Sequence, residues 1–249
     1  MFKFNSKYSK ILTMMLVILI VAIVGLAGYF AYDMMNASAI NTKAESVVDE
    51  FEKSTESVKK TIKRQETANQ ELPDIDTSTE VNPIMETTET TSTEVAQTST
   101  ETTSNAQVKA EKKYLEGFEV LGTINIPKTK CKYPILNQVT KKSLETAVAV
   151  LYPIDAELNV DNNVTIVGHN YRNNLFFSNN YKLREGDTIE ITSPYEKVTY
   201  VIYDYHYLEP SDASYMQRDI PEGVREIALS TCNDDSSQRL VILAREQGK

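Results

Sequence analysis

The chain has 249 residues, with 26 Lys and Arg against 35 Asp and Glu, and a formal net charge of −9. This balance argues against a protein that holds nucleic acid through a general basic surface. Two cysteines are too few for a disulfide scaffold or a thiolate-rich zinc site. The charge is also uneven, because residues 73–107 hold seven acids and no Lys or Arg; without them the chain carries −2.

A long apolar run near the N-terminus predicts a membrane-spanning helix over residues 11–32. The run contains no charged side chain, and about 20 apolar residues cross the hydrocarbon core as a helix. Three lysines precede it and Asp33 follows, so the positive-inside rule places residues 1–10 in the cytoplasm and the rest outside the cell membrane. A cleaved signal peptide is the alternative, since residues 37–39 (ASA) fit a cleavage site. We favour a single-pass anchor because the run exceeds the about 7 to 15 residues of a signal peptide.

The next segment, residues 33–72, is predicted to be a helical stalk. Apolar residues recur there at helical spacing, namely Ala44, Val47, Phe51, Val58 and Ile62. The stripe is thin, and Ser54 and Thr55 interrupt it. The sequence therefore leaves two alternatives, a short stalk helix and a solvated helix that frays in isolation.

Residues 73–110 are rich in Ser, Thr and Glu and contain almost nothing that a core could bury. This composition predicts a disordered linker. Its like charges repel, so we expect an extended tether that holds the following domain away from the membrane.

Residues 111–249 change to short runs rich in Ile, Val, Thr and Tyr, separated by turn residues. The runs are 122–127, 133–136, 164–167, 188–192, 198–205, 226–231 and 240–244. Seven or eight strands without a long helical period predict an all-β fold, either a sandwich or a closed barrel. One helix is expected over residues 141–150, with Thr140 as its cap.

Three residues that can carry chemistry stand at the ends of these runs. Cys232 follows one strand, Arg239 opens the next, and His169 follows an apolar strand that ends in Gly168. A hairpin would bring Cys232 and Arg239 together. Thiolate is a nucleophile, His transfers protons and Arg stabilises an oxyanion. From spacing alone, an inert thiol, a structural His and a solvated Arg remain open.

Three motifs resemble those of the sortase family. Residues 229–232 (LSTC), followed by residues 239–242 (RLVI), resemble the cysteine signature. Residues 168–170 (GHN) resemble the histidine motif. Residues 121–127 (LGTINIP), continuing to residues 133–135 (YPI), resemble the opening of the barrel. All three occur in the family's order, behind an N-terminal anchor.

The resemblance implies a fold, an activity and a set of partners. The fold is a closed sortase-type eight-stranded β-barrel with one or two short helices over residues 111–249. The activity is that of a cysteine transpeptidase of Gram-positive bacteria, which cleaves secreted proteins at an LPxTG-like C-terminal sorting signal, between Thr and Gly. The acceptor is an amine of a lipid-linked peptidoglycan precursor or a pilin lysine. No cofactor, metal or nucleic acid is implied; some relatives are activated by calcium, but the acids here are too scattered to support it.

The resemblance also implies residue roles. Cys232 would attack the Thr carbonyl and form a thioester, and His169 would protonate the departing amine. Arg239 would hydrogen-bond substrate carbonyls and stabilise the oxyanion, and Thr231 would help to position the substrate or the oxyanion.

The remaining Cys and His match no motif, so we interpret Cys131 as an unpaired strand residue and His206 as structural. The rival function is a non-catalytic extracellular β-domain displayed on a stalk for adhesion, which a disulfide between Cys131 and Cys232 would favour. The subclass stays open: the single N-terminal anchor and the absence of Trp point away from pilin polymerases, towards an A-like or unclassified sortase.

Overall fold

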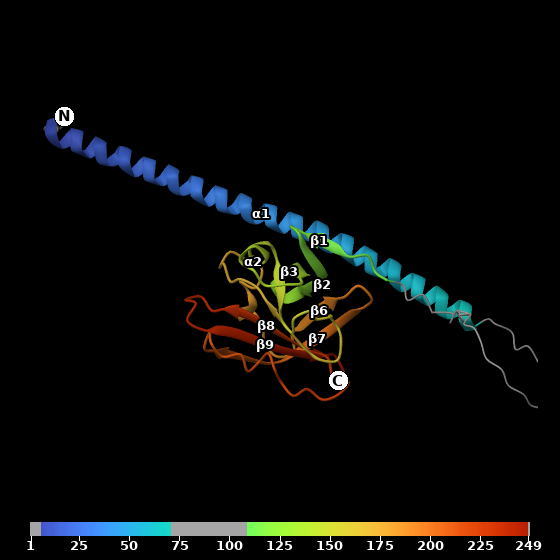
Figure 1. The fold of residues 1–249 in the computed structure, drawn as a ribbon. Helices are drawn as coiled ribbons and strands as arrows, with labels where there is room; N and C mark the ends of the chain where they lie inside the picture. The colour runs from blue at the N-terminus through green and yellow to red at the C-terminus, as the bar shows by residue number, and fades with distance from the viewer. Residues whose placement is uncertain (1–5, 71–108, 249) are drawn as a thin grey trace, which may run out of the picture.

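The computed structural model describes residues 6–70 and 109–248. One helix, α1 (Ser6–Gln70), runs through both the predicted membrane span and the predicted stalk, and its two ends project past the folded domain (Figure 1). Within the described ranges it is the one helix long and apolar enough to cross a membrane. The predicted linker over residues 73–110 lies outside the described residues, apart from its last two positions.

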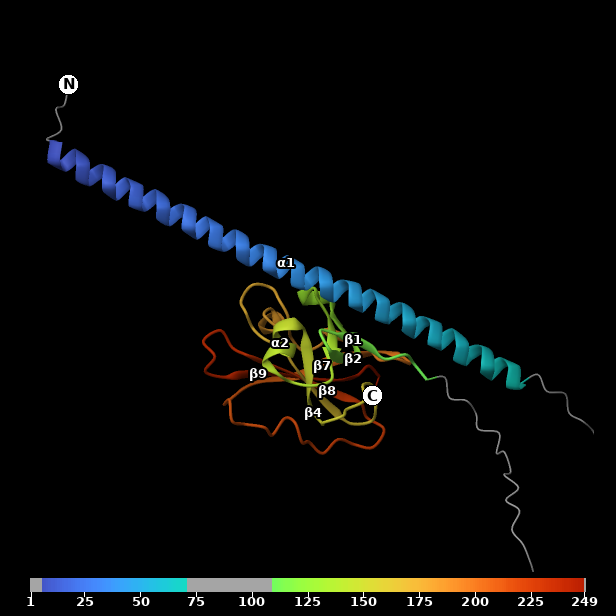
Figure 2. The same ribbon diagram turned by 45° about the horizontal axis from the view of Figure 1, so that its top comes forward.

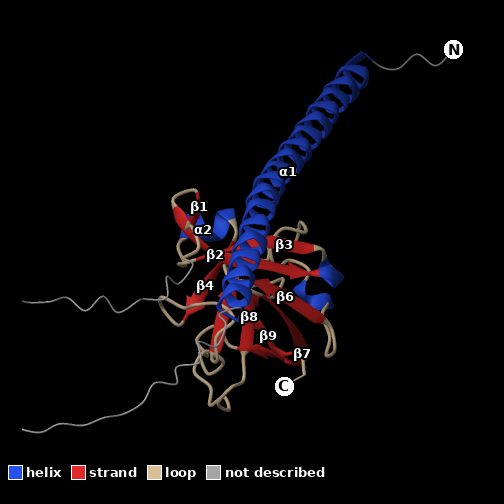
Figure 3. Cartoon of the chain, turned by 90° about the vertical axis from the view of Figure 1, so that its right-hand side faces the viewer, coloured by secondary structure: helices blue, strands red, loops and turns tan. Residues whose placement is uncertain are grey.

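Within residues 109–248, nine strands, two 3₁₀ turns and one short helix follow α1. They are β1 (Lys113–Leu115), β2 (Phe118–Ile126), η1 (Pro127–Thr129), β3 (Cys131–Leu136), α2 (Lys141–Thr146), β4 (Val148–Tyr152), β5 (Asn163–Val167), η2 (Asn180–Lys182), β6 (Thr188–Thr192), β7 (Lys197–Leu208), β8 (Glu226–Cys232) and β9 (Arg239–Glu246). The strand order is β1-β2-β3-β4-β5-β8-β9-β7-β6, and β6 also pairs with β2. This pairing closes β2 to β9 into a barrel, with β1 as an added strand beside β2 (Figure 3).

The predicted closed eight-stranded barrel is therefore confirmed. Its sheet is mixed, because β3 pairs with β4 and β5 with β8 in parallel, while the other neighbours are antiparallel. The interior is filled by alternate side chains of the strands, among them Ile124, Ile135, Val150, Ile166, Ile191, Tyr200, Leu229 and Ile242.

The helix predicted over residues 141–150 is wrong in its second half. The helix α2 ends at Thr146, and residues 148–152 form β4. Thr140 caps α2 as predicted, through a reciprocal capping box with Ser143. Val148, Ala149 and Val150 are each at most 4% exposed, and β-branched residues buried on both faces are typical of an interior strand. Burial between β3 and β5 thus overrides the short helical pattern.

The stalk part of α1 packs along the barrel, across β2 and β3 (Figures 1 and 2). Its buried residues are Ala44, Val48, Phe51 and Thr55, which follow one another at steps of three or four residues and so share one helical face. The Thr55 hydroxyl donates to the Ser193 carbonyl oxygen at 3.1 Å. The segment predicted as a stalk is thus helical, and its packing on the barrel is a contact that the sequence analysis did not predict.

Ion pairs flank this buried stripe. Lys132 Nζ lies 3.1 Å from Asp49 Oδ1, and Lys113 Nζ lies 2.8 Å from Glu50 Oε1. Such exposed pairs are worth about 0–1 kcal/mol each, so burial of the apolar stripe dominates the docking. The distance between the barrel and the apolar N-terminal run is consequently set by α1.

Candidate active site

Cys232 and Arg239 face each other at one end of the β8–β9 hairpin. They are a registered pair of the antiparallel ladder, and the Arg239 guanidinium donates to Cys232 Sγ at 2.6 Å. The connecting loop is closed by Asn233, whose amide donates to the Gln238 carbonyl oxygen at 3.0 Å. The hairpin expected from the sequence thus holds a partly exposed thiol against a permanent positive charge.

His169 stands at the same end of the barrel, because β5 runs parallel to β8 and both strands end there. The Gly168 amide donates to the Ser230 carbonyl oxygen at 3.2 Å, which continues the ladder up to the histidine. A Cβ at position 168 would lie 2.9 Å from side-chain atoms of both Phe177 and Val148, so only glycine fits this close approach. The turn before His169 is consequently fixed by packing.

Two further side chains connect the His169 turn with the cysteine loop. The buried Thr231 hydroxyl donates to the Gly168 carbonyl oxygen at 2.7 Å. The Asn170 side-chain amide donates to the Cys232 carbonyl oxygen at 3.1 Å and to Asp234 Oδ1 at 2.9 Å. The Thr231 hydroxyl therefore supports the turn before His169, and its part in positioning the substrate or the oxyanion stays a prediction. The sequence analysis did not predict that Asn170 connects the two segments. The position of Asn170 directly after His169 in the chain could have suggested it.

The half-buried position of His169 affects its charge. Burial lowers the pKa of His169, and the nearby Arg239 charge lowers it further, whereas the carboxylate of Glu145 on α2 acts to raise it. Within residues 109–248, no hydrogen bond joins His169 to Cys232, so the cysteine has Arg239 as its charged partner in this state.

Both cysteines are free thiols in the structure. Cys131 is 4% exposed in β3, and burial raises its pKa to about 12. The disulfide that the display function would favour is absent from the described residues, and Cys131 is confirmed as an unpaired strand residue. His206, in contrast to His169, lies on the exposed part of β7, where its Nε2 is 2.9 Å from Asp204 Oδ2.

Thiol alkylation is expected to separate the two cysteines. In the folded full-length chain, iodoacetamide should label Cys232 and leave Cys131 unmodified, because thiolate is the reactive species and Cys131 is both buried and protonated. Mass spectrometry of the peptides reads the result, and both sites should react in denaturant. Comparable labelling of Cys131 without denaturant would contradict the packing described for β3.

The residues that form this site lie in a part of the chain that matches a known protein family. A family model described as the sortase domain matches residues 124–247, a range that contains Cys232, His169 and Arg239. This domain belongs to the sortase family. Sortase domains are cysteine transpeptidases, and this chain therefore carries a cysteine transpeptidase domain behind a long apolar N-terminal helix.

Several solved sortase structures are similar to the chain. A lid mutant of sortase A from Corynebacterium diphtheriae is 26% identical, with a TM-score of 0.47, over 57% of this chain and 74% of that one. Sortase C-1 from Actinomyces oris is 22% identical, with a TM-score of 0.47, over 52% and 75%. A sortase D5 transpeptidase from Clostridium perfringens is 23% identical, with a TM-score of 0.46, over 52% and 79%. No curated protein sequence matches the chain.

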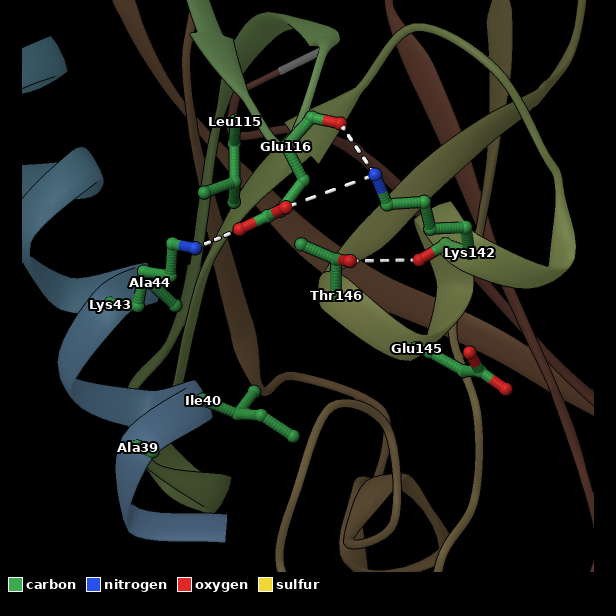
Figure 4. A pocket seen from close by; sticks show the side chains of 9 residues that line it. All are labelled: Ala39, Ile40, Lys43, Ala44, Leu115, Glu116, Lys142, Glu145 and Thr146. Atoms are coloured by element: carbon green, nitrogen blue, oxygen red, sulfur yellow. Dashed lines mark hydrogen bonds and ion pairs between the residues drawn. The ribbon is translucent and has the colours of Figure 1, made fainter. Parts of the chain in front are cut away.

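A pocket of about 230 Å³ lies between α1, the β1–β2 turn and α2 of this sortase (Figure 4). Glu116 in the turn pairs with Lys43 of α1 and with Lys142 of α2, so its carboxylate ties the three elements together. Glu145, which faces the pocket rim, is also the carboxylate that acts on His169. The pocket thus places α1 close to the histidine side of the site.

Proposed function

We propose that this sortase cleaves an LPxTG-like sorting signal between Thr and Gly, and that Cys232, His169 and Arg239 carry out the reaction. The observation that supports this most is the contact of Arg239 with Cys232 Sγ at 2.6 Å, on a strand pair whose parallel neighbour β5 leads into His169. These three groups are a nucleophile, a proton donor and an oxyanion stabiliser at one end of the barrel.

In the first half-reaction, the Cys232 thiolate attacks the Thr carbonyl carbon. The negative charge moves to the carbonyl oxygen, where the Arg239 guanidinium donates hydrogen bonds. When the C–N bond breaks, imidazolium at His169 gives its proton to the departing Gly amine, and a thioester remains on Cys232. The lowered pKa of His169 leaves only a fraction of molecules with the proton in place near neutral pH.

In the second half-reaction, an acceptor amine attacks the thioester carbonyl. His169, now neutral, accepts the proton that the amine loses, and the C–S bond breaks to restore the Cys232 thiolate. We propose an amine of a lipid-linked peptidoglycan precursor or a pilin lysine as the acceptor. The secreted substrates would reach the enzyme outside the cell, because the apolar helix with its preceding lysines orients residues 1–10 towards the cytoplasm.

The test uses the full-length chain in detergent micelles with a Leu-Pro-x-Thr-Gly peptide. We expect a new protein mass equal to the chain plus the peptide up to Thr, located on Cys232, and its release as a hydroxamate on addition of hydroxylamine. A peptide library around this motif then defines the preferred signal. Failure of every library member to form a thioester on Cys232 would reject the proposed activity.

A pH prediction follows from the charge of Glu145. Replacing Glu145 with Gln removes the carboxylate that raises the pKa of His169, so this pKa should fall further below its ordinary value. At pH 7 fewer molecules would hold imidazolium, and kcat/KM at that pH should decrease. NMR titration of the imidazole signals measures the shift. An unchanged His169 titration would show that Glu145 does not act on it.

A further inference from the structure

An unbroken series of contacts leads from α1 to His169. Asn41 of α1 accepts a hydrogen bond from the Tyr133 hydroxyl of β3. The Tyr133 ring packs on Phe176, with 5.0 Å between ring centroids, and Phe176 packs on Tyr171 at 5.8 Å. The Tyr171 ring in turn lies 4.8 Å from the His169 imidazole. Helix and imidazole are thus joined by side chains in direct contact.

The loop that carries these aromatic residues folds back on the histidine. The Phe177 amide donates to the His169 carbonyl oxygen at 3.1 Å, and Asn170 and Phe176 form an isolated β-bridge. The Tyr171 amide donates to Ser178 Oγ at 3.0 Å. The place of His169 therefore depends on where the segment around Phe176 is held.

This segment is held in a costly conformation. Arg172, Asn174 and Phe176 have positive φ angles of 59°, 68° and 51°, a region that side chains other than glycine avoid. Such residues persist where surrounding contacts determine them, often at functional sites. Phe176 is 1% exposed between two tyrosines, so its burial against Tyr133 is what opposes relaxation of the loop.

The Tyr133 hydroxyl depends on α1 for its hydrogen-bond acceptor. Its side chain is 3% exposed, and burial raises its pKa to about 12, with an opposing contribution from the Phe176 backbone. A buried O–H donor without an acceptor is unfavourable, and Asn41 supplies the acceptor from the helix. We propose that docked α1 positions His169 for proton transfer through Asn41, Tyr133 and Phe176, which makes the membrane-proximal helix a working part of the active site.

This inference rests on the proposed function, and it assigns Asn41 and Tyr133 as positioning residues. It predicts an effect on proton transfer and none on binding of the sorting signal, because β8 and β9 carry Cys232 and Arg239 independently of α1. The interface offers a matched control, since Asp49 also joins α1 to β3, through Lys132, without touching Tyr133.

The experiment compares Asn41→Leu, Asn41→Asp and Asp49→Ala in the full-length chain in detergent micelles, with a Leu-Pro-x-Thr-Gly peptide and hydroxylamine. We expect Asn41→Leu to lower kcat about fivefold, the effect of losing one hydrogen bond of ordinary strength, with KM for the peptide unchanged. Asn41→Asp, which retains an acceptor oxygen, should restore kcat. The control should keep kcat within about twofold of the parent, as exposed ion pairs contribute little.

NMR of the His169 imidazole in the same proteins reports the position of His169 independently of enzyme activity. Its signals should shift or broaden in Asn41→Leu and match the parent in the other two variants. Parent-like signals or parent-like kcat in Asn41→Leu, or no rescue by Asn41→Asp, would overturn the inference. Absence of a Cys232 thioester in the parent would instead reject the proposed function, and the imidazole signals would still report on α1.

Discussion

Replacing Cys232 with Ala is expected to reduce cleavage of a sorting peptide by at least about 10⁴-fold, as removal of a catalytic nucleophile does in acyl-transfer enzymes. No thioester can form without the Sγ atom that Arg239 contacts. Arg239 and His169 would remain in place, because both are held by backbone pairing of β9 and β5 with β8. The loss should therefore appear in turnover and acyl-enzyme mass, while the thermal stability of the domain changes little.

Cys131→Ala is the matched control for that experiment. It removes the chain's other thiol, which is buried in β3, and it should leave thioester formation intact at some cost in stability from lost packing. If turnover survived in Cys232→Ala and disappeared in Cys131→Ala, Cys131 and not Cys232 would be the nucleophile. Turnover that survives in both single variants would show that neither thiol is the nucleophile.

The sequence carried enough information for the barrel and for the hairpin of the site. Alternating β-branched strands and turn residues predict closure of an all-β domain, and a strand–loop–strand pattern places Cys232 opposite Arg239. The meeting of His169 with this hairpin follows from parallel pairing of β5 with β8, a long-range contact that local patterns do not encode. The resemblance to sortases supplied that link.

Other features depend on tertiary packing and escaped prediction. The strand β4 was assigned to a helix because burial on both faces removes the period of two. The docking of α1 was not predicted, because four buried residues on a helix otherwise rich in polar groups give a weak amphipathic signal. The direction of Thr231 and the bridge formed by Asn170 depend on rotamers and on a loop conformation, for which the chain has no short-range signal.

The second large effect is expected at Glu226, at the opposite end of β8 from Cys232. Its side chain is fully buried and accepts hydrogen bonds from Arg245 at 2.9 Å and from the Tyr203 hydroxyl at 2.8 Å, and it pairs with Arg218 at 2.5 Å. Removing one partner of a buried ion pair leaves an uncompensated charge and costs about 3–5 kcal/mol. Glu226→Ala should thus lower the midpoint of thermal unfolding by on the order of 10 °C for a domain of this size.

The same cluster supports the segment over residues 209–225, which leads back to the catalytic strand. Arg218 and Tyr215 both belong to this segment. Tyr215 packs on Ala228, and its hydroxyl lies 3.2 Å from the hydroxyl of Ser230 in β8. Loss of Glu226 should therefore loosen this segment where it packs on β8, the strand that ends in Cys232, and KM for a sorting peptide should rise before the domain unfolds. Hydrogen exchange of the segment's amides, measured well below the unfolding midpoint, reads this local effect.

Glu196→Ala provides the comparison that makes the Glu226 prediction specific. Glu196 pairs at 3.1 Å with Arg225, the residue that precedes Glu226 in the chain. The Glu196 side chain, unlike that of Glu226, is 39% exposed. Because water screens such a pair, its loss should cost less than about 1 kcal/mol and leave KM unchanged. Equal destabilisation by the two substitutions would mean that burial of the Glu226 cluster adds nothing, and that the segment over residues 209–225 is held by its apolar contacts alone.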